Sequence, residues 1–218
     1  MSIFLLEVTI LWLKKQPRKR NNCMKILLFG GAFDPPHLGH HSITKNILDQ
    51  NLADQIWYVP TKTHPFAKKL SLDKHRLKML SFLVATDKRT RIETFELDKD
   101  GVSFSHETLD SLSKKHPKHE FSWLIGSDNL KKFHLWGDSK GRDFKEMLSK
   151  YRFYVYPRKG FEFFPLHENM IPLKNMEEIV VSSTLVKEKM EKDESIDALV
   201  MDEVIQYMEE NNLYKKER

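Results

Sequence analysis

The sequence predicts an α/β fold in which a parallel, doubly wound sheet is covered by helices on both faces. Short apolar runs that end at glycine or proline alternate with longer segments whose apolar residues recur at helical spacing. This alternation is typical of parallel strands joined by right-handed helical crossovers. The composition is globular, with 40% hydrophobic and 31% charged residues. The length of 218 residues suits one domain with its own core.

The first half of the chain alternates three strands with three helices. The strands are apolar runs that end at turn signals: 25–29 before two glycines, 55–59 before Pro60, and 90–96 before a turn at Gly101. The first helix is 38–52, with Ile43, Ile47 and Leu48 on one face. The second is 71–85, which Ser71 can cap, and the third runs from 103 or 105 to 115. The segment 61–70 between them is polar and cationic, which indicates a loop.

The second half continues the same alternation. The predicted strands are 121–125, again ending at a glycine, 151–156, and a short strand near 171–173. The predicted helices are short ones at 129–133 and 143–148, followed by 182–191 and 198–211. Because ligands of such sheets bind beyond the carboxyl ends of the strands, functional residues are expected directly after strands.

The charge of the chain is concentrated at its N-terminus. The formal net charge is +5, and residues 1–23 carry +4 of it, with five basic residues against Glu7. The remaining body is close to neutral, which argues against a nucleic-acid partner. The single cysteine, Cys23, excludes an internal disulfide framework and a multi-cysteine metal site, and it indicates a reducing, cytoplasmic location. The oligomeric state stays open.

Residues 1–23 are expected to form an extension outside the fold, with 24–218 as a single domain and Met24 as an alternative start. An apolar run, 3–13, precedes the basic cluster 14–20, which is the reverse of the order in a secretory signal. The run is also shorter than the roughly 20 residues that a spanning helix needs. A weak anchor that lies on a membrane surface is the alternative for this segment.

The loop after the first strand carries the strongest functional pattern. Gly30 and Gly31 permit close approach of the backbone to a ligand. The next helix starts near Leu38, so its free N–H groups and positive dipole end face the same place. His37 and His40 lie on one side of the first helical turn and can donate hydrogen bonds to a phosphate.

Other chemistries at this loop have weaker support. No GK[ST] or GxGxxG pattern is present, so the loop is neither a Walker loop nor a dinucleotide fingerprint. A metal site built from His37, His40 and Asp34 or His41 is the alternative, but no HExxH motif or cysteine accompanies it.

A second candidate is the string 181–187 (VSSTLVK), which opens a helix. Its hydroxyls, on Ser182, Ser183 and Thr184, suit a polyphosphate together with the N-terminal N–H groups of the helix. The structural alternative is simple N-capping. Lys187 adds a positive charge one turn into the helix.

These strings resemble a known superfamily. The segment 30–40 (GGAFDPPHLGH) resembles the G-x-F-D-P-x-H-x-G-H signature of the HxGH nucleotidyltransferases. The string 181–187 resembles their I-S-S-T-x-x-R motif, with Lys187 at the arginine position. Lysine keeps the charge but lacks the bidentate fork of arginine, which predicts weaker ATP binding or slower turnover.

The middle of the chain resembles the bacterial nicotinate-nucleotide adenylyltransferases. The matching strings are 101–109 (GVSFSHETL), similar to G-x-S-Y-T-x-x-T-L, 124–130 (LIGSDNL) with a later tryptophan, 158–160 (RKG), and 213–214 (LY). Phe104 stands where tyrosine is usual and Ser105 where threonine is usual. The basic loop that contains Lys68 and Lys69 departs from the family pattern.

The resemblance implies a Rossmann-like nucleotidyltransferase fold and transfer of AMP from ATP to nicotinate mononucleotide, with Mg²⁺ carried on the phosphates and no metal ligand from the chain. His37, His40 and Lys187 would be catalytic. The further residues expected to bind ATP are Gly30, Gly31, Phe33, Ser182, Ser183 and Thr184. The residues expected to bind the acceptor are Asp34, Lys68, Lys69, Phe104, Ser105, Asp128, Trp136 and Arg158.

The residue chemistry agrees with this implication. A flat pyridine ring stacks on an aromatic such as Trp136, its carboxylate meets donors around Phe104 and Ser105, and Asp128 accepts from ribose hydroxyls. The structural alternatives are core packing for Trp136 and a helix cap for Asp128. The functional alternatives are nicotinamide mononucleotide or phosphopantetheine as acceptor, and a non-catalytic nucleotide-binding protein.

Overall fold

A computed structural model describes residues 23–62, 70–99 and 101–215. Its centre is a six-stranded sheet in which every neighbouring pair is parallel, in the order β3-β2-β1-β4-β5-β6. The strands are β1 (Lys25–Gly31), β2 (Gln55–Pro60), β3 (Thr90–Ile92), β4 (Glu120–Gly126), β5 (Arg152–Tyr156) and β6 (Met170–Pro172). The predicted α/β fold with a doubly wound parallel sheet is confirmed.

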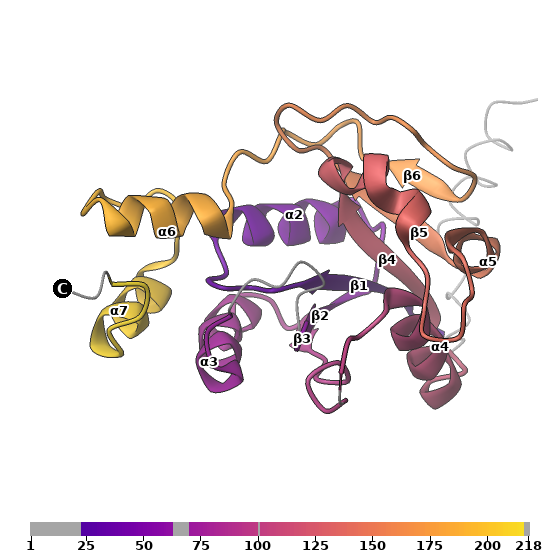
Figure 1. The fold of residues 1–218 in the computed structure, drawn as a ribbon, viewed down its shortest axis with the longest axis horizontal. Helices are drawn as coiled ribbons and strands as arrows, with labels where there is room; N and C mark the ends of the chain where they lie inside the picture. Colours follow the sequence, from indigo (N-terminus) through magenta and orange to yellow (C-terminus); the bar gives the residue numbers. More distant parts are fainter. Residues whose placement is uncertain (1–22, 63–69, 100, 216–218) are drawn as a thin grey trace, which may run out of the picture.

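Helices lie on both sides of this sheet (Figure 1). They are α2 (Leu38–Asp49), α3 (Asp73–Val84), α4 (Ser105–Lys115), the 3-10 helix η1 (Ser127–Leu135), α5 (Phe144–Lys150), α6 (Ser183–Glu191) and α7 (Asp202–Glu210). None of the helices in the described ranges is long and apolar enough to cross a membrane. The expectations for the first 22 residues lie outside the described residues.

Alternate residues of the strands build one core on each face of the sheet. Ile26 and Leu28 of β1 pack with the apolar residues of α4, η1 and α5. Leu27 and Phe29, one residue out of phase, pack with those of α2 and α3. Both faces of a parallel sheet are thereby covered, which explains why its strands are continuous apolar runs.

The third core joins the C-terminal helices to the body. It contains Met79 of α3, Val186 of α6, Val204 and Met208 of α7, and residues of the segment between α6 and α7. In Figure 1, α6 and α7 lie together at one end of the molecule, beside α2 and α3. Helices α6 and α7 therefore return to the end of the sheet where the loop after β1 begins.

Several predicted element limits are wrong. Helix α2 ends at Asp49 and not at 52, and Asn51 just beyond it has a φ of +55°. The third strand ends at Ile92 because the chain turns at Thr94, whose carbonyl accepts from the backbone N–H groups of two later residues. Helix α3 begins after Leu72, and Ser71 does not cap it. The last helix begins at 202 and not at 198, because the preceding turn presents the carbonyl of Leu199 to the backbone N–H of Leu38 at 2.8 Å.

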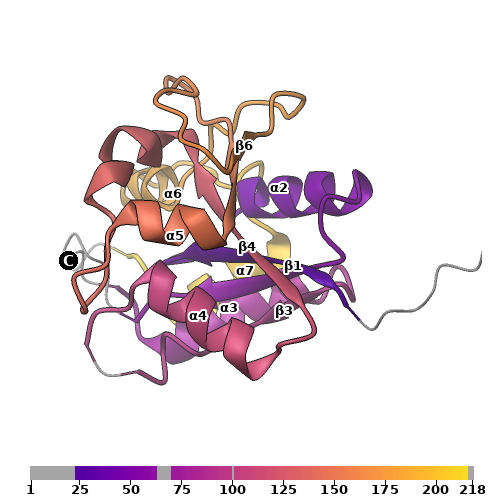
Figure 2. The same ribbon diagram turned by 90° about the vertical axis from the view of Figure 1, so that its right-hand side faces the viewer.

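The sheet order reverses between β1 and β4, which both pair with a second strand on their outer side. Loops that leave the carboxyl ends of these two central strands run in opposite directions and leave a crevice between them. Figure 2, turned by 90°, shows β1 and β4 crossing the centre of the molecule with helices above and below. The site described next lies at this switch point.

Candidate active site

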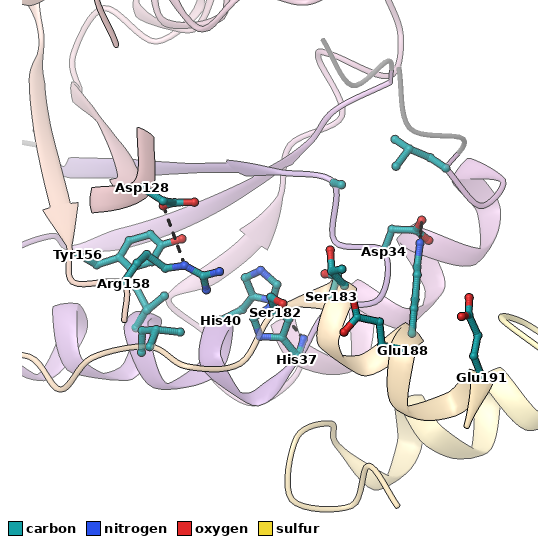
Figure 3. Close-up of a pocket in the computed structure, with 16 residues that line it drawn as sticks. Asp34, His37, His40, Asp128, Tyr156, Arg158, Ser182, Ser183, Glu188 and Glu191 are labelled. Carbon is teal, nitrogen blue, oxygen red and sulfur yellow. Dashed lines mark hydrogen bonds and ion pairs between the residues drawn. The ribbon is translucent and has the colours of Figure 1, made fainter. Parts of the chain in front are cut away.

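A cavity of about 670 Å³ lies at the carboxyl ends of the central strands. Its walls come from the loop after β1 and the start of α2, from the residues after β4 and β5, and from the first turns of α6 (Figure 3). The sequence-predicted residues that line it are Asp34, His37, His40, Asp128, Arg158, Ser182, Ser183, Thr184 and Lys187. Nine predicted residues from four separate segments thus share one cavity of the size that holds small ligands.

The two histidines form a stacked pair at the start of α2. Their ring centroids are 3.6 Å apart and the ring planes differ by 22°. Nδ1 of His40 accepts a hydrogen bond from the backbone N–H of His37 at 3.1 Å. In the neutral ring this acceptor role leaves the proton of His40 on Nε2, which is a donor. Nδ1 of His37 is buried and has no hydrogen-bond partner within the described part of the chain.

The environment of this pair holds both rings neutral. Burial lowers the pKa of His37 to about 3, and the charge of Arg158 adds to the effect. Burial also holds the pKa of His40 well below its ordinary value, with contributions from His37 and Arg158. At neutral pH each imidazole therefore offers one N–H donor without a positive charge, and an anion placed beside the pair would raise both pKa values.

Gly39 brings the histidine helix against the segment that precedes α6. A Cβ atom at this position would lie 2.6 Å from Cγ1 of Val181 and 2.9 Å from Cγ2 of Ile179. Only glycine allows this approach without a shift of the neighbours. Gly39 belongs to the string 30–40 that resembles the nucleotidyltransferase signature, but that string does not reveal a packing requirement that depends on a residue 142 positions away.

The glycines that end β1 serve packing inside the fold. A Cβ on Gly30 would overlap the ring of Trp123, and one on Gly31 would lie 3.2 Å from Cζ of Phe33. Phe33 is 1% exposed and its ring lies 4.9 Å from that of His40, so it supports the histidine from behind. Gly30, Gly31 and Phe33 do not line the cavity, although the sequence analysis placed them among the ATP-binding residues.

The start of α6 faces the histidines across the cavity. Ser182 caps the helix, since its Oγ accepts from the backbone N–H of Leu185 at 3.1 Å. The Oγ of Ser183 donates to the carbonyl of Pro35 at 2.8 Å and so ties α6 to the loop after β1. The hydroxyl of Thr184 belongs to an exposed side chain that lines the cavity. These polar groups and the helix dipole make this wall suitable for phosphates.

Lys187 is held by an ion pair with Asp34. The Nζ–Oδ2 distance is 2.6 Å, and Asp34 is 2% exposed. Burial raises the pKa of Asp34, but the hydrogen bonds from Lys187 and Tyr214 and the charge of Lys187 outweigh it and hold the carboxyl below its usual range. Asp34 is therefore ionised at neutral pH, and it orients a lysine.

Asp128 and Arg158 form the opposite end of the cavity. Arg158 Nε lies 3.9 Å from Asp128 Oδ1, and its guanidinium donates to the carbonyl of Val181 at 2.9 Å. Figure 3 shows the guanidinium between Asp128 and the histidines. A Cβ on Gly126 would overlap the Asp128 carboxylate and lie 2.9 Å from Cγ of Arg158. The glycine that ends β4 is thus required where this pair meets.

The expected base-binding residues lie outside this cavity. Phe104 occupies the N-cap position of α4 and Ser105 is its first residue. Trp136 is half-buried, directly follows η1, and has its ring centroid 4.9 Å from that of Phe133. Lys68 and Lys69 lie outside the described residues. No group of three or more metal-ligating side chains suited to a metal ion occurs within the described ranges.

The cavity also contains residues that the sequence analysis missed. Tyr156, at the end of β5, and Glu188 and Glu191 of α6 line it. The two glutamates follow Thr184 by four and seven residues, so they lie on the helix face that also carries Lys187. This spacing could have identified them as cavity residues from the sequence.

Comparison with known proteins places this chain in a family. The cytidylyltransferase-like family model matches residues 28–189. A protein of Bacillus licheniformis named as a probable nicotinate-nucleotide adenylyltransferase is 32% identical over 196 residues, 88% of this chain and 98% of its own length. The chain belongs to the nicotinate-nucleotide adenylyltransferase family.

A further relative agrees with this membership, and a solved structure shares the fold. The nicotinate-nucleotide adenylyltransferase of Bacillus subtilis is 30% identical, covering 88% of this chain and 98% of its own. The Plasmodium falciparum nicotinic acid mononucleotide adenylyltransferase, solved with NaAD, superimposes with a TM-score of 0.71 at 19% identity, over 87% of this chain and 97% of that one. This second similarity supports the Rossmann-like nucleotidyltransferase fold.

Proposed function

We propose that this chain transfers AMP from ATP to nicotinate mononucleotide, giving deamido-NAD and pyrophosphate in NAD biosynthesis. The observation that carries the proposal is the stacked, neutral pair of His37 and His40, which faces Lys187 and the start of α6 across one cavity. Relatives named for this reaction match over 87–88% of the chain at 30–33% identity. Donors of this kind suit a phosphoryl-type reaction, in which positioning and charge stabilisation do most of the catalysis.

The reaction needs no covalent enzyme intermediate. A 5′-phosphate oxygen of the mononucleotide attacks the α-phosphorus of ATP, and the bond from that phosphorus to the bridging oxygen of pyrophosphate breaks. The Nε2–H of His40 and the N–H of His37 donate to the phosphate oxygens on which charge increases. Lys187 and the N-terminal groups of α6 hold the β- and γ-phosphates that leave.

The donor set of the cavity fits Mg²⁺ that arrives bound to ATP. Imidazole, ammonium and hydroxyl groups bind phosphate oxygens, and the buried carboxylate at this wall, Asp34, is already paired with Lys187. Mg²⁺ prefers phosphate and water oxygens with only one or two carboxylates. When bound, the ion neutralises phosphate charge, and this chain places Glu188 and Glu191 on the same wall as further oxygen donors.

The acceptor would extend from the cavity toward α4. The first turn of α4, at Ser105, offers free backbone N–H groups that suit a carboxylate on the pyridine ring. The half-buried Trp136 offers an aromatic face for the ring itself. Asp128, at the cavity end next to Arg158, suits a ribose hydroxyl.

The test is release of pyrophosphate from ATP and Mg²⁺ with either nicotinate or nicotinamide mononucleotide, measured side by side. We expect a strong preference for the acid. Equal rates would retain the reaction but contradict the account of base recognition at α4 and Trp136. Absence of release with both mononucleotides would refute the proposed acceptor, and the same assay with phosphopantetheine would then identify the alternative.

A further inference from the structure

The last described residues of the chain return to the candidate active site. After α7, Tyr214 places its phenolic hydroxyl on Oδ1 of Asp34, 180 residues earlier in the sequence. The same carboxylate holds Lys187 through Oδ2. The loop after β1, the phosphate-binding helix and the C-terminal segment therefore meet at one buried carboxylate.

The backbone at Tyr214 is specialised for this contact. Its φ is +60°, in the left-handed region that bulky residues avoid. Such a conformation persists where the surroundings determine it, and it prompts a functional hypothesis. At Tyr214 the determining contacts are the hydroxyl on Asp34 and the ring beneath the ammonium of Lys187, at 4.7 Å from its centroid.

A lysine at position 187 makes these contacts important. The planar fork of arginine is rigid and fits phosphate oxygens in pairs, whereas the lysine stem is flexible and its ammonium is a point charge. Lys187 is confined by Asp34 on one side, at 2.6 Å, and by the ring of Tyr214 on another. Its remaining N–H donors are left for a ligand in the cavity that it lines.

We propose that Tyr214 is a positioning residue for ATP: it fixes Asp34 and, through Asp34 and its own ring, holds the ammonium of Lys187 at the phosphate-binding wall. This inference rests on the proposed function, in which that wall receives the β- and γ-phosphates. A purely structural role, in which the hydroxyl only fastens the chain end, is the competing explanation.

The chain offers a matched control for that explanation. Tyr207 of α7 also makes a long-range side-chain hydrogen bond, between its hydroxyl and Nδ1 of His75 at 2.9 Å. This contact fastens the C-terminal region to α3 but does not involve the cavity. Tyr214→Phe and Tyr207→Phe each remove one hydroxyl and keep the ring, but the lost hydrogen bond is to the cavity carboxylate Asp34 in the first variant and to His75, away from the cavity, in the second.

The experiment measures the Kd for ATP by calorimetry and the KM values for ATP and the mononucleotide, with melting temperatures to establish folding. Because the lost hydrogen bond is to a charged group, we expect Tyr214→Phe to weaken ATP binding about fivefold to tenfold. We expect the KM for the mononucleotide to change less than about twofold. Tyr207→Phe should leave both constants within about twofold of the wild type.

A double-mutant cycle shows whether Tyr214 acts through Lys187. In the Lys187→Ala background, Tyr214→Phe should have no further effect on the Kd for ATP. An unchanged Kd in the single variant, or an equally large effect in the Lys187→Ala background, would overturn the inference. A wild-type chain that does not bind ATP would overturn both proposals. ATP binding with this pattern but without pyrophosphate release would refute the proposed function alone.

Discussion

Replacement of Glu96 by glutamine should stabilise the protein at high pH. Glu96 follows β3 and is only 5% exposed. Its carboxyl accepts a hydrogen bond from Oγ1 of Thr108 on α4 at 2.9 Å. Burial raises its pKa from 4.5 to about 7, although Thr108, Thr61 and the charge of Lys99 act in the opposite direction. Glu96 thus connects the end of β3 to the first turns of α4, where the acceptor base is proposed to bind.

The size and sign of the effect follow from this shift. Between pH 4.5 and 7 the folded chain retains a proton on Glu96 that the unfolded chain has lost. The contribution of this group to stability is therefore fully present below pH 4.5 and is lost as pH rises through 7. At about 1.4 kcal/mol per pKa unit, the ionised carboxylate costs roughly 3 kcal/mol above pH 7. Glutamine keeps the hydrogen-bonding shape and carries no charge.

The assay is urea unfolding of the wild type and Glu96→Gln at pH 5 and pH 8. We expect the variant to be more stable by about 2–3 kcal/mol at pH 8 and by less than about 1 kcal/mol at pH 5. Protonation of His37 and His40 occurs in both chains and cancels in the difference. Glu168→Gln, at an exposed loop position, is the control and should change neither value. A stability difference that is the same at both pH values would refute the reasoning.

Three further substitutions test the site. His40→Ala should lower kcat about 100-fold or more with much smaller changes in KM, because the lost donor acts mainly in the transition state; near-full turnover would contradict this role. Lys187→Arg should lower the KM for ATP severalfold through bidentate contacts, and an unchanged or higher KM would show that lysine is not the weaker ligand. Gly39→Ala should destabilise the fold by about 1–3 kcal/mol and reduce turnover, since the new Cβ meets Val181; wild-type melting and turnover would show that α2 tolerates the added atom.

The sequence predicted the fold because its signals are local and repeated. Apolar runs that end at glycine or proline identify β1, β2 and β4, and the helices predicted from 143 and 182 correspond to α5 and α6, which Asp143 and Ser182 cap in the structure. Some limits were wrong because of local turns, as at the end of β3, and the start of α7 depends on a contact with another segment. The carbonyl of Leu199, for example, is used by the backbone N–H of Leu38 and not by a helix.

The candidate site was predictable to the extent that strand order determines it. His37, Asp128 and Arg158 each follow a strand, so the rule for carboxyl ends of parallel strands brings them together. The partners of Asp34 were not predictable, because its carboxylate binds Lys187 and Tyr214, which lie 153 and 180 positions later in the sequence. The packing reason for Gly30 was not predictable either, because its missing side chain accommodates Trp123 on the neighbouring strand; its role at a phosphate-binding turn stays a prediction.

The protonation of the two histidines in the cavity depends on whether an anionic ligand is bound. Among the residues that the structure describes, the two cations that line the cavity are each next to a carboxylate, Lys187 with Asp34 and Arg158 with Asp128. Its histidines are neutral because they are buried. The charged form of each imidazole is disfavoured until a negative charge arrives beside it. A polyphosphate supplies that charge, so the histidines become stronger donors when the nucleotide is bound. Because burial keeps the two histidines neutral in the free protein, they become stronger hydrogen-bond donors only when an anionic substrate binds beside them.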